Sequence, residues 1–301
     1  SSTFNPGDGF VIIDRVYDRE GGNSANLYLT KDGTQEAPIT FKGEGTVILD
    51  AKKERNYLIY IRTGNNWIIE KLILINAKSI GLTTGYNCNY LTLKDLVIGY
   101  AGGKGIFVPS DGDYYVISEN TIFETGDIGI SLDGRHHTVR KNVVYQIGYM
   151  GIRVRADDSV VDQNIIFSTA STGIYAMGGG NSQTTISRNI VLRTKGNGLN
   201  IGYYTTQDKL VNNTVVASSS HGIFISSDSP NNTLKNNIFV YNGGNGITNY
   251  ANENTFHDFN LMYGNGGADY VGSDGPGPNS ITGQDPLFFW EVQATADDGG
   301  T

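Results

Sequence analysis

Two arginines separated by one residue, Arg153 and Arg155, are well suited to bind a carboxylate group. Each guanidinium group is permanently charged and presents a fork of donors that matches both oxygens of a carboxylate. If both residues belong to one strand, the alternation of side chains places them on the same face. We therefore treat Arg153 and Arg155 as candidate catalytic residues that face an acidic substrate. A surface ion pair with Asp133 is the alternative interpretation.

Three aspartates, Asp133, Asp157 and Asp158, form a candidate metal site. Asp133 precedes Asp157 by 24 residues and Asp158 by 25 residues, which is about one repeat of the chain described below. Hard oxygen ligands from adjacent repeats are the ligands that Ca²⁺ prefers. The spacing therefore predicts a Ca²⁺ site at these three residues, with solvated turn aspartates as the alternative.

His136 and Lys195 are the remaining candidates for proton transfer. His136 stands in the sequence Asp133-Gly134-Arg135-His136-His137, and a histidine can act as acid or base near neutral pH. Adjacent residues of a strand point to opposite sides, so at most one of the two histidines can join a site. Lys195 is a candidate base because a buried lysine among positive charges loses its proton more readily. A solvated turn lysine is the alternative.

These candidates lie within or close to a phrase that repeats from Gly129 to Gly246. Gly-Ile or Gly-Leu opens the phrase six times, and the steps between the glycines are 22, 22, 25, 24 and 24 residues. This period, with alternating apolar positions and no helix-length amphipathic run, predicts a solenoid of short strands, a parallel β-helix. Each unit also holds one asparagine, so we expect a structural asparagine ladder between coils. Its members are Asn120, Asn142, Asn164, Asn189, Asn213 and Asn237.

The same phrase identifies the outward positions of the strands. In Gly-Ile-x-Val, the Ile and Val side chains point inward, whereas x and the residue after Val face solvent. The outward positions include Phe107, Tyr175 and Asn200, and Tyr203 and Tyr204 follow them closely. Aromatic rings along a groove stack on sugar rings, so these five residues are the candidate substrate-binding residues. Simple packing of a side-chain ladder is the alternative.

Composition sets the class of the protein. The chain has 301 residues, 38% of them hydrophobic, which suffices for one large core. We expect a single all-β domain, with residues 1–35 as an irregular cap, 36–289 as about ten coils and 290–301 as a polar tail. The net charge of −8 argues against nucleic acid as a partner, because phosphate binding requires a basic face. No apolar run approaches the roughly 18 residues of a membrane span. We therefore expect no membrane insertion, and we expect a monomer.

Residues 33–50 carry a more specific signal. Gly33-Thr34 is followed by Pro38-Ile39-Thr40 and then by Val47-Ile48-Leu49-Asp50. This stretch resembles the first turns of secreted bacterial right-handed β-helix proteins that act on polysaccharides, including pectate, alginate and chondroitin lyases. The resemblance implies a right-handed β-helix, an acidic polysaccharide as partner, and secretion or a place at the cell surface. It also implies calcium, because similar aspartates on successive coils hold this ion in the pectate lyases.

We therefore expect a polysaccharide lyase that cleaves a uronate-containing glycan by β-elimination with the assistance of Ca²⁺. The resemblance implies arginine or lysine as the base. Two alternatives remain, a β-helical glycoside hydrolase and a non-catalytic glycan-binding or surface solenoid. The hydrolase requires two carboxylates across a groove, and the sequence lacks the Asn-x-Asp, Asp-Asp, Gly-His-Gly and Arg-Ile-Lys series of the polygalacturonases.

Overall fold

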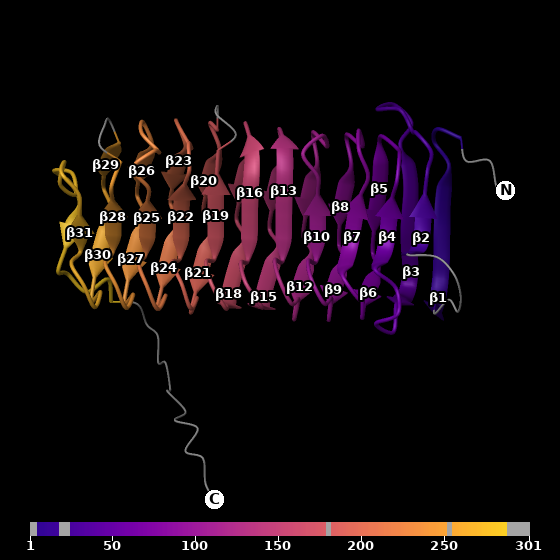
Figure 1. The fold of residues 1–301 in the computed structure, drawn as a ribbon, viewed down its shortest axis with the longest axis horizontal. Coiled ribbons are helices and arrows are strands. Elements are labelled where there is room, and N and C mark those ends of the chain that lie inside the picture. Colours follow the sequence, from indigo (N-terminus) through magenta and orange to yellow (C-terminus); the bar gives the residue numbers. More distant parts are fainter. Residues whose placement is uncertain (1–4, 18–24, 179–181, 252–254, 288–301) are drawn as a thin grey trace, which may run out of the picture.

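The computed structural model describes residues 5–17, 25–178, 182–251 and 255–287. All regular secondary structure in these ranges is β-strand, and the coils stack along the long axis of the molecule from β1 to β31 (Figure 1). Each strand pairs in parallel with the equivalent strand of the next coil. No helix in these ranges has the length and apolar character needed to cross a membrane. The prediction of an all-β parallel β-helix is confirmed.

Each regular coil contributes one strand to an eleven-stranded sheet, which carries the candidate site. Its members are β2 (Ala25–Leu29), β4 (Tyr57–Ile61), β7 (Ile80–Thr84), β10 (Ile106–Val108), β13 (Ile130–Arg135), β16 (Ile152–Asp157), β19 (Ile174–Met177), β22 (Leu199–Gly202), β25 (Ile223–Ile225), β28 (Ile247–Asn249) and β31 (Tyr270–Val271).

The other two strands of each coil belong to a twenty-one-stranded sheet that divides into two ladders. The long strands β1 (Gly9–Tyr17) and β3 (Ile39–Asp50) join them. The β5–β29 ladder contains β5 (Trp67–Glu70), β8 (Thr92–Lys94), β11 (Val116–Ser118), β14 (Thr138–Arg140), β17 (Val160–Asp162), β20 (Thr185–Ser187), β23 (Lys209–Val211), β26 (Thr233–Lys235) and β29 (Phe256–Asp258). The β6–β32 ladder contains β6 (Ile73–Ile75), β9 (Val97–Gly99), β12 (Thr121–Phe123), β15 (Val143–Ile147), β18 (Ile165–Thr169), β21 (Ile190–Leu192), β24 (Thr214–Val216), β27 (Ile238–Val240), β30 (Leu261–Tyr263) and β32 (Ile281–Thr282).

The N-terminal segment is more regular than the sequence predicts. Residues 9–17 form β1, which pairs in parallel with β3, and residues 25–29 form β2, which pairs with β4. The expectation of irregular structure across residues 1–35 is therefore wrong for these two strands. Parallel pairing with the following coil supplies the backbone hydrogen bonds that a free segment would lack. The expected tail, residues 290–301, lies outside the described residues.

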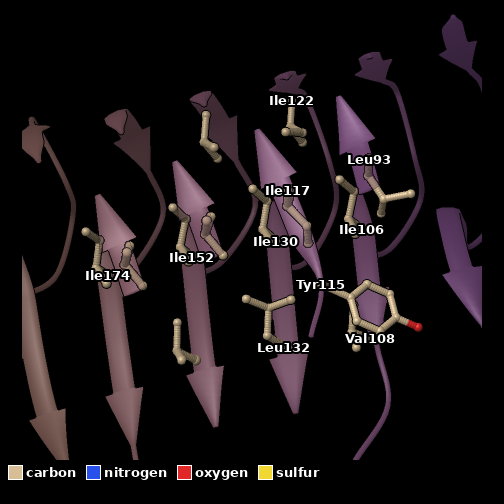
Figure 2. Packing of buried hydrophobic residues seen from close by; sticks show 14 of the residues in the cluster. Leu93, Ile106, Val108, Tyr115, Ile117, Ile122, Ile130, Leu132, Ile152 and Ile174 are labelled. Carbon is tan, nitrogen blue, oxygen red and sulfur yellow. The ribbon is translucent and has the colours of Figure 1, made fainter. Parts of the chain in front are cut away.

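The core consists of rows in which the same apolar position stacks from coil to coil. Ile106, Ile130, Ile152 and Ile174 are paired in register, fully buried, and aligned in Figure 2. The glycine before each of these residues is required by close packing. A Cβ on Gly129 would lie 2.5 Å from Cγ1 of Val144 and 2.7 Å from the carbonyl oxygen of Gly151. The Gly-Ile phrase therefore marks the point where the chain passes close to the next coil.

The repeated asparagines form a buried ladder at the corner between the two ladders of the larger sheet. The backbone N–H of Asn142 donates to Oδ1 of Asn164 at 3.0 Å, and its Nδ2 donates to the same oxygen at 2.9 Å. Nδ2 also donates to the carbonyl of Ile117 at 2.9 Å. The residue before each asparagine has a positive φ, as at Gln163 (φ 56°), which turns the chain at this corner. The same bonds continue through Asn120, Asn189, Asn213, Asn237 and Asn260, and the prediction of a structural ladder is confirmed.

We expect Asn164→Ala to lower the free energy of unfolding by about 3 kcal/mol, because it leaves buried amide groups of the neighbouring coils without partners. Oδ1 of Asn164 accepts both the backbone N–H and Nδ2 of Asn142, so two donors lose their acceptor at once. Urea-induced unfolding followed by circular dichroism measures the change. Gln163→Ala is the matched control, because Gln163 is the exposed preceding residue at the same corner. An equal decrease in the free energy of unfolding in Asn164→Ala and Gln163→Ala would contradict a stabilising role for the ladder.

Candidate active site

The register of the eleven-stranded sheet brings the outward candidate residues together as predicted. Phe107 pairs with Ser131, Ser131 with Arg153, Arg153 with Tyr175, and Tyr175 with Asn200. Asp133 is likewise paired with Arg155, two residues further along the strands. The outward rows therefore lie across β10, β13, β16, β19 and β22 in the order that the repeat indicates.

Asp133 lies between the two arginines and binds both. Nη2 of Arg153 donates to Oδ1 of Asp133 at 2.7 Å. Arg155 binds the same carboxylate with two donors, Nε to Oδ1 at 3.2 Å and Nη2 to Oδ2 at 2.7 Å. The side chain of Asp133 is 6% exposed, whereas that of Arg155 is 48% exposed. The arginines thus cover the carboxylate and present their outer sides to solvent.

An open polar groove of about 730 Å³ adjoins this cluster, at the end of β13 and β16. Four carboxylates and two guanidinium groups line it, which gives a formal charge of −2. Asp113, Arg135 and Asp157 pair in register from coil to coil, Asp133 pairs with Arg155, and Asp111 lies in the turn that follows β10. Asn87, Asn89, Ser110, Gly134 and Gly178 complete the lining.

Two carboxylate oxygens that belong to this groove are buried without a hydrogen-bond partner, Oδ1 of Asp111 and Oδ1 of Asp157. The other oxygen of Asp111 accepts the backbone N–H of Asn87 at 3.2 Å. A buried polar atom without a partner is costly in a folded protein and marks a place where a ligand or a proton can bind. Both residues therefore have the capacity to interact with a substrate.

The calcium site expected at Asp133, Asp157 and Asp158 does not fit this arrangement. The coil between β13 and β16 is 22 residues long, so Asp133 aligns with Arg155, and Asp157 aligns with Arg135 instead. Both oxygens of Asp133 are already bound by guanidinium groups. No group of three or more His, Cys, Asp or Glu that could hold a metal ion occurs in the part of the chain that the structure describes.

Tyr175 lies beside Arg153 on the next coil and is half-buried. Its ring extends over Gly202, where a Cβ would lie 2.8 Å from the phenol oxygen. Burial raises the pKa of the Tyr175 phenol, Tyr203 and Tyr149 act in the same direction, and Arg153 opposes them. The phenol is therefore protonated at neutral pH and is available as a hydrogen-bond donor.

The other expected substrate-binding residues extend this face in both directions. Tyr203 and Tyr204, after β22, are 59% and 64% exposed. Asn200 is partly exposed and pairs with Tyr175. Phe107 lies two coils before Arg153, and Nζ of Lys104 lies 5.3 Å from the centre of its ring. The aromatic residues thus flank the arginine cluster along the axis of the solenoid.

His136 and Lys195 are not brought to the groove. His136 has a positive φ and stacks on Tyr114, with ring centres 4.7 Å apart, and neither residue lines the groove. Its neighbour His137 is buried and structural. It accepts the N–H of Tyr115, and burial lowers its pKa to about 4. Lys195 lines a different groove of about 700 Å³, together with Lys53 and Arg193.

The groove contains residues that were not among the predicted site residues, notably Asn87, Asp111 and Arg135. Counting along the outward row does not lead to Asp111, because β10 and β13 pair at a step of 24 residues, with Val108 opposite Leu132. The step is 22 residues only beyond the end of β10, where Asp113 pairs with Arg135. The turn after β10 therefore brings Asp111 to the groove.

This architecture places the chain in a known class. A family model described as a right-handed beta helix region matches residues 105–261, and the chain belongs to this family. No curated protein matches the sequence significantly.

Three solved structures illustrate the similarity of the fold. The A-module of the mannuronan C-5 epimerase AlgE4 from Azotobacter vinelandii is 14% identical, with a TM-score of 0.62 over 93% of this chain and 87% of that one. The pectate lyase Pel9A is 13% identical, with a TM-score of 0.56 over 92% and 72%. The catalytic unit of a GH87 α-1,3-glucanase from Streptomyces thermodiastaticus is 14% identical, with a TM-score of 0.65 over 92% and 62%. At these identities, the comparisons establish the fold alone.

Proposed function

We propose that the chain is a polysaccharide lyase that binds a uronate-containing glycan across β13, β16 and β19 and cleaves it by β-elimination. The observation that carries this proposal is the outward cluster of Arg153, Asp133 and Arg155, with Tyr175 on the next coil. The similarity of fold to an alginate-acting epimerase and a pectate lyase supports the choice of substrate class. Such a substrate places the protein outside the cell or at its surface.

Substrate binding follows from the charges of the cluster. A uronate carboxylate is equivalent in shape and charge to the carboxylate of Asp133, which the two arginines hold. The exposed guanidinium group of Arg155 can bind both oxygens of the substrate carboxylate. The side chain of Arg153 is 22% exposed, so its guanidinium group provides a further donor. Neutralising the carboxylate in this way makes the adjacent C5 proton more acidic.

The residues on either side of the arginines supply the acid and the base. When the guanidinium groups turn toward the substrate, the carboxylate of Asp133 becomes free to accept the C5 proton. The C5–H electrons form the C4–C5 double bond, the C4–O4 bond breaks, and the Tyr175 phenol donates its proton to the leaving oxygen. Asp133 and Tyr175 lie one coil before and one coil after Arg153, so their strands are about 10 Å apart, which leaves room for one sugar ring.

The proposal is tested by incubating the full chain with a panel of uronate polysaccharides, including pectate and alginate, with and without added Ca²⁺. An unsaturated product that absorbs in the near ultraviolet is the expected result. No increase in absorbance with any uronate would overturn the lyase. Retention of the protein on a glycan column without turnover would indicate the non-catalytic binder instead.

A glycoside hydrolase is the second candidate, and one observation favours it. Asp111 and Asp157 line the same groove, and each has a buried carboxylate oxygen without a partner. Hydrolysis of a glycosidic bond requires two carboxylates across a groove, one as acid and one as base or nucleophile. New reducing ends without near-ultraviolet absorbance would support this activity. If Asp111→Asn and Asp157→Asn each abolish the hydrolase activity, these two residues are its acid and its base or nucleophile.

We expect Tyr175→Phe to lower kcat about 100-fold with little change in KM, because it removes the proposed proton donor and keeps the ring. Initial rates of near-ultraviolet absorbance over a range of substrate concentrations measure both constants. Tyr149→Phe is the control, since Tyr149 is close enough to influence Tyr175 but is exposed and outside the proposed chemistry. A Tyr175→Phe variant with unchanged kcat would contradict this role.

A further inference from the structure

The outer face of the β6–β32 ladder is apolar along most of its length. We call the first and third residues of β6, β9, β12, β15, β18, β21, β24, β27 and β30 the apolar strip. Of these eighteen positions only Thr121 and Thr214 are polar, Gly99 has no side chain, and the others are aliphatic or aromatic. Most are partly exposed, and Ile165 and Ile190 reach 39% and 40%. A contiguous exposed apolar surface of this size marks an interaction site.

The outer face of the β5–β29 ladder is not apolar in this way, so the apolar composition is specific to the β6–β32 ladder. Outward positions of the β5–β29 ladder carry Glu70, Lys94, Arg140, Asp162 and Lys235. They form ion pairs across coils, such as Lys94 with Glu70 at 2.9 Å. Both ladders use the same fold and the same repeat. The apolar strip is therefore not a consequence of the architecture.

The aromatic residues of the strip are arranged for contact with protein rather than sugar. Phe123, Tyr145 and Phe167 stack on one another, with ring centres 5.5 and 4.9 Å apart and interplanar angles of 12° and 4°. The faces of the central ring are thus both occupied, and the three rings present edges to solvent. A sugar ring requires an exposed aromatic face, whereas an apolar protein surface packs well against ring edges.

We propose that the apolar strip binds the apolar strip of a second copy of this chain. The two-fold axis runs parallel to the strands and passes between β15 and β18. This axis reverses the order of coils, so that β12 faces β21 of the partner and β9 faces β24. Phe123, whose ring also covers Gly99, then opposes the partner subunit's Leu192.

Charged residues at the edge of the strip select this arrangement. Glu124 follows β12 and Arg193 follows β21; both are exposed, and neither forms an ion pair within the described part of the chain. Three coils separate them in one subunit, a distance of about 14 Å. In the proposed dimer, each Glu124 faces the partner subunit's Arg193, which forms two ion pairs.

The other possible two-fold axis, along the solenoid, brings like charges together. Each coil would then face the same coil of the partner with reversed strands. Glu124 would oppose the partner subunit's Glu119, and Arg193 would oppose the partner subunit's Arg188. Lys141 and Asp162 pair with these two residues within each subunit, so this axis gives Glu124 and Arg193 no free opposite charge. Like charges across an interface are unfavourable, so the axis parallel to the strands is preferred.

The size of the strip is sufficient for a specific dimer. Nine strands at the spacing of a sheet, with the residues at both edges, give a surface of about 40 by 15 Å, which corresponds to about 1,200 Å² buried in total. This lies at the lower limit of stable interfaces. The proposed dimer leaves the eleven-stranded sheet and its groove uncovered, and it does not depend on the proposed function. It differs from the monomer expected from the sequence.

Sedimentation equilibrium of the full chain tests the proposal, with a dimer expected at 100 µM. Ile165→Glu is expected to raise the dimer dissociation constant at least tenfold. Val160→Glu is the matched control, since Val160 is 37% exposed but lies on the β5–β29 ladder, and it should leave the constant unchanged. A wild-type protein that remains monomeric at this concentration would overturn the proposal. The apolar strip would then bind a different protein or residues 288–301 of the same chain. Equal effects of the two substitutions would also overturn it.

A charge exchange tests the orientation of the two subunits. Glu124→Arg and Arg193→Glu should each weaken the dimer, because each places two like-charged pairs at the interface. The double variant should restore the wild-type dissociation constant, because it recreates both ion pairs with their signs exchanged. Failure of the double variant to recover would overturn the proposed axis.

Discussion

Arg155→Ala is expected to lower kcat/KM on the uronate substrate about 100-fold, which corresponds to about 3 kcal/mol of lost transition-state stabilisation. The substitution removes the more exposed of the two guanidinium groups that bind the carboxylate. It also leaves Asp133 with Arg153 alone. Arg155→Lys should recover only part of the loss, because an ammonium group cannot bind both oxygens in the same way. Initial rates from the near-ultraviolet assay measure the effect.

Arg188→Ala distinguishes this role from that of a simple surface ion pair. Arg188 binds Asp162 with the same bidentate geometry, Nε at 2.8 Å and Nη2 at 2.7 Å, and its side chain is 58% exposed. It lies at the corner between β20 and β21 and does not line the groove. If Arg155 only neutralises Asp133, Arg155→Ala and Arg188→Ala should lower the free energy of unfolding by similar amounts, and both variants should keep full lyase activity. That result would remove Arg155 from the proposed site.

The repeat allowed the register of the site to be predicted because neighbours in a solenoid are set by coil length. Residues one coil apart pair, so the outward positions of Ser131, Arg153, Tyr175 and Asn200 follow from counting. The asparagine ladder follows for the same reason. An Asn at a fixed point of each coil has an Asn above and below it, and the buried amides can pair only with each other and with the backbone.

The groove could not be predicted in the same way, because local turn conformation decides it. β13 and β16 have six residues each, whereas β10 has three, and this extension places Arg135 and Asp157 beside each other. His136 has a positive φ, and its ring turns to Tyr114 instead of the groove. The calcium prediction assumed a 24-residue coil where the chain uses 22, and an offset of two residues moves Asp157 about 7 Å along the strand.

Asp208 is a buried aspartate outside the candidate site, and it joins neighbouring coils by hydrogen bonds as the ladder asparagines do. Asp208 is fully buried, and its Oδ1 accepts the N–H of Thr184 at 2.8 Å. Its own N–H donates to Oδ1 of Asn232, the equivalent residue of the next coil, at 2.8 Å. Oδ2 of Asp208 has no partner. Burial raises the pKa of this carboxyl to about 7, and the charge of Asp157 acts in the same direction, whereas the N–H of Thr184 and the nearby Ser182 hydroxyl oppose the shift.

Asp208→Asn is therefore expected to stabilise the protein increasingly as the pH rises. The folded pKa of Asp208 lies above the unfolded value of 3.8, so the folded state binds the proton more tightly. The stability that this proton provides is complete below pH 3.8 and is lost as the pH rises toward about 7. The variant should match the wild type at pH 4 and exceed it by up to about 4 kcal/mol at pH 8. Its amide keeps the acceptor for Thr184 and stays neutral.

Urea unfolding of both proteins at several pH values between 4 and 8 measures this difference. Titration of His137 must be separated from that of Asp208, because burial lowers its pKa to about 4 and its contribution is lost as the pH falls. His137 is present in both proteins, so its effect cancels in the difference between them. A stability difference that does not change with pH would show that Asp208 is not protonated in the folded protein. A difference that grows from pH 4 to pH 7 and then levels off would confirm the buried, protonated carboxyl.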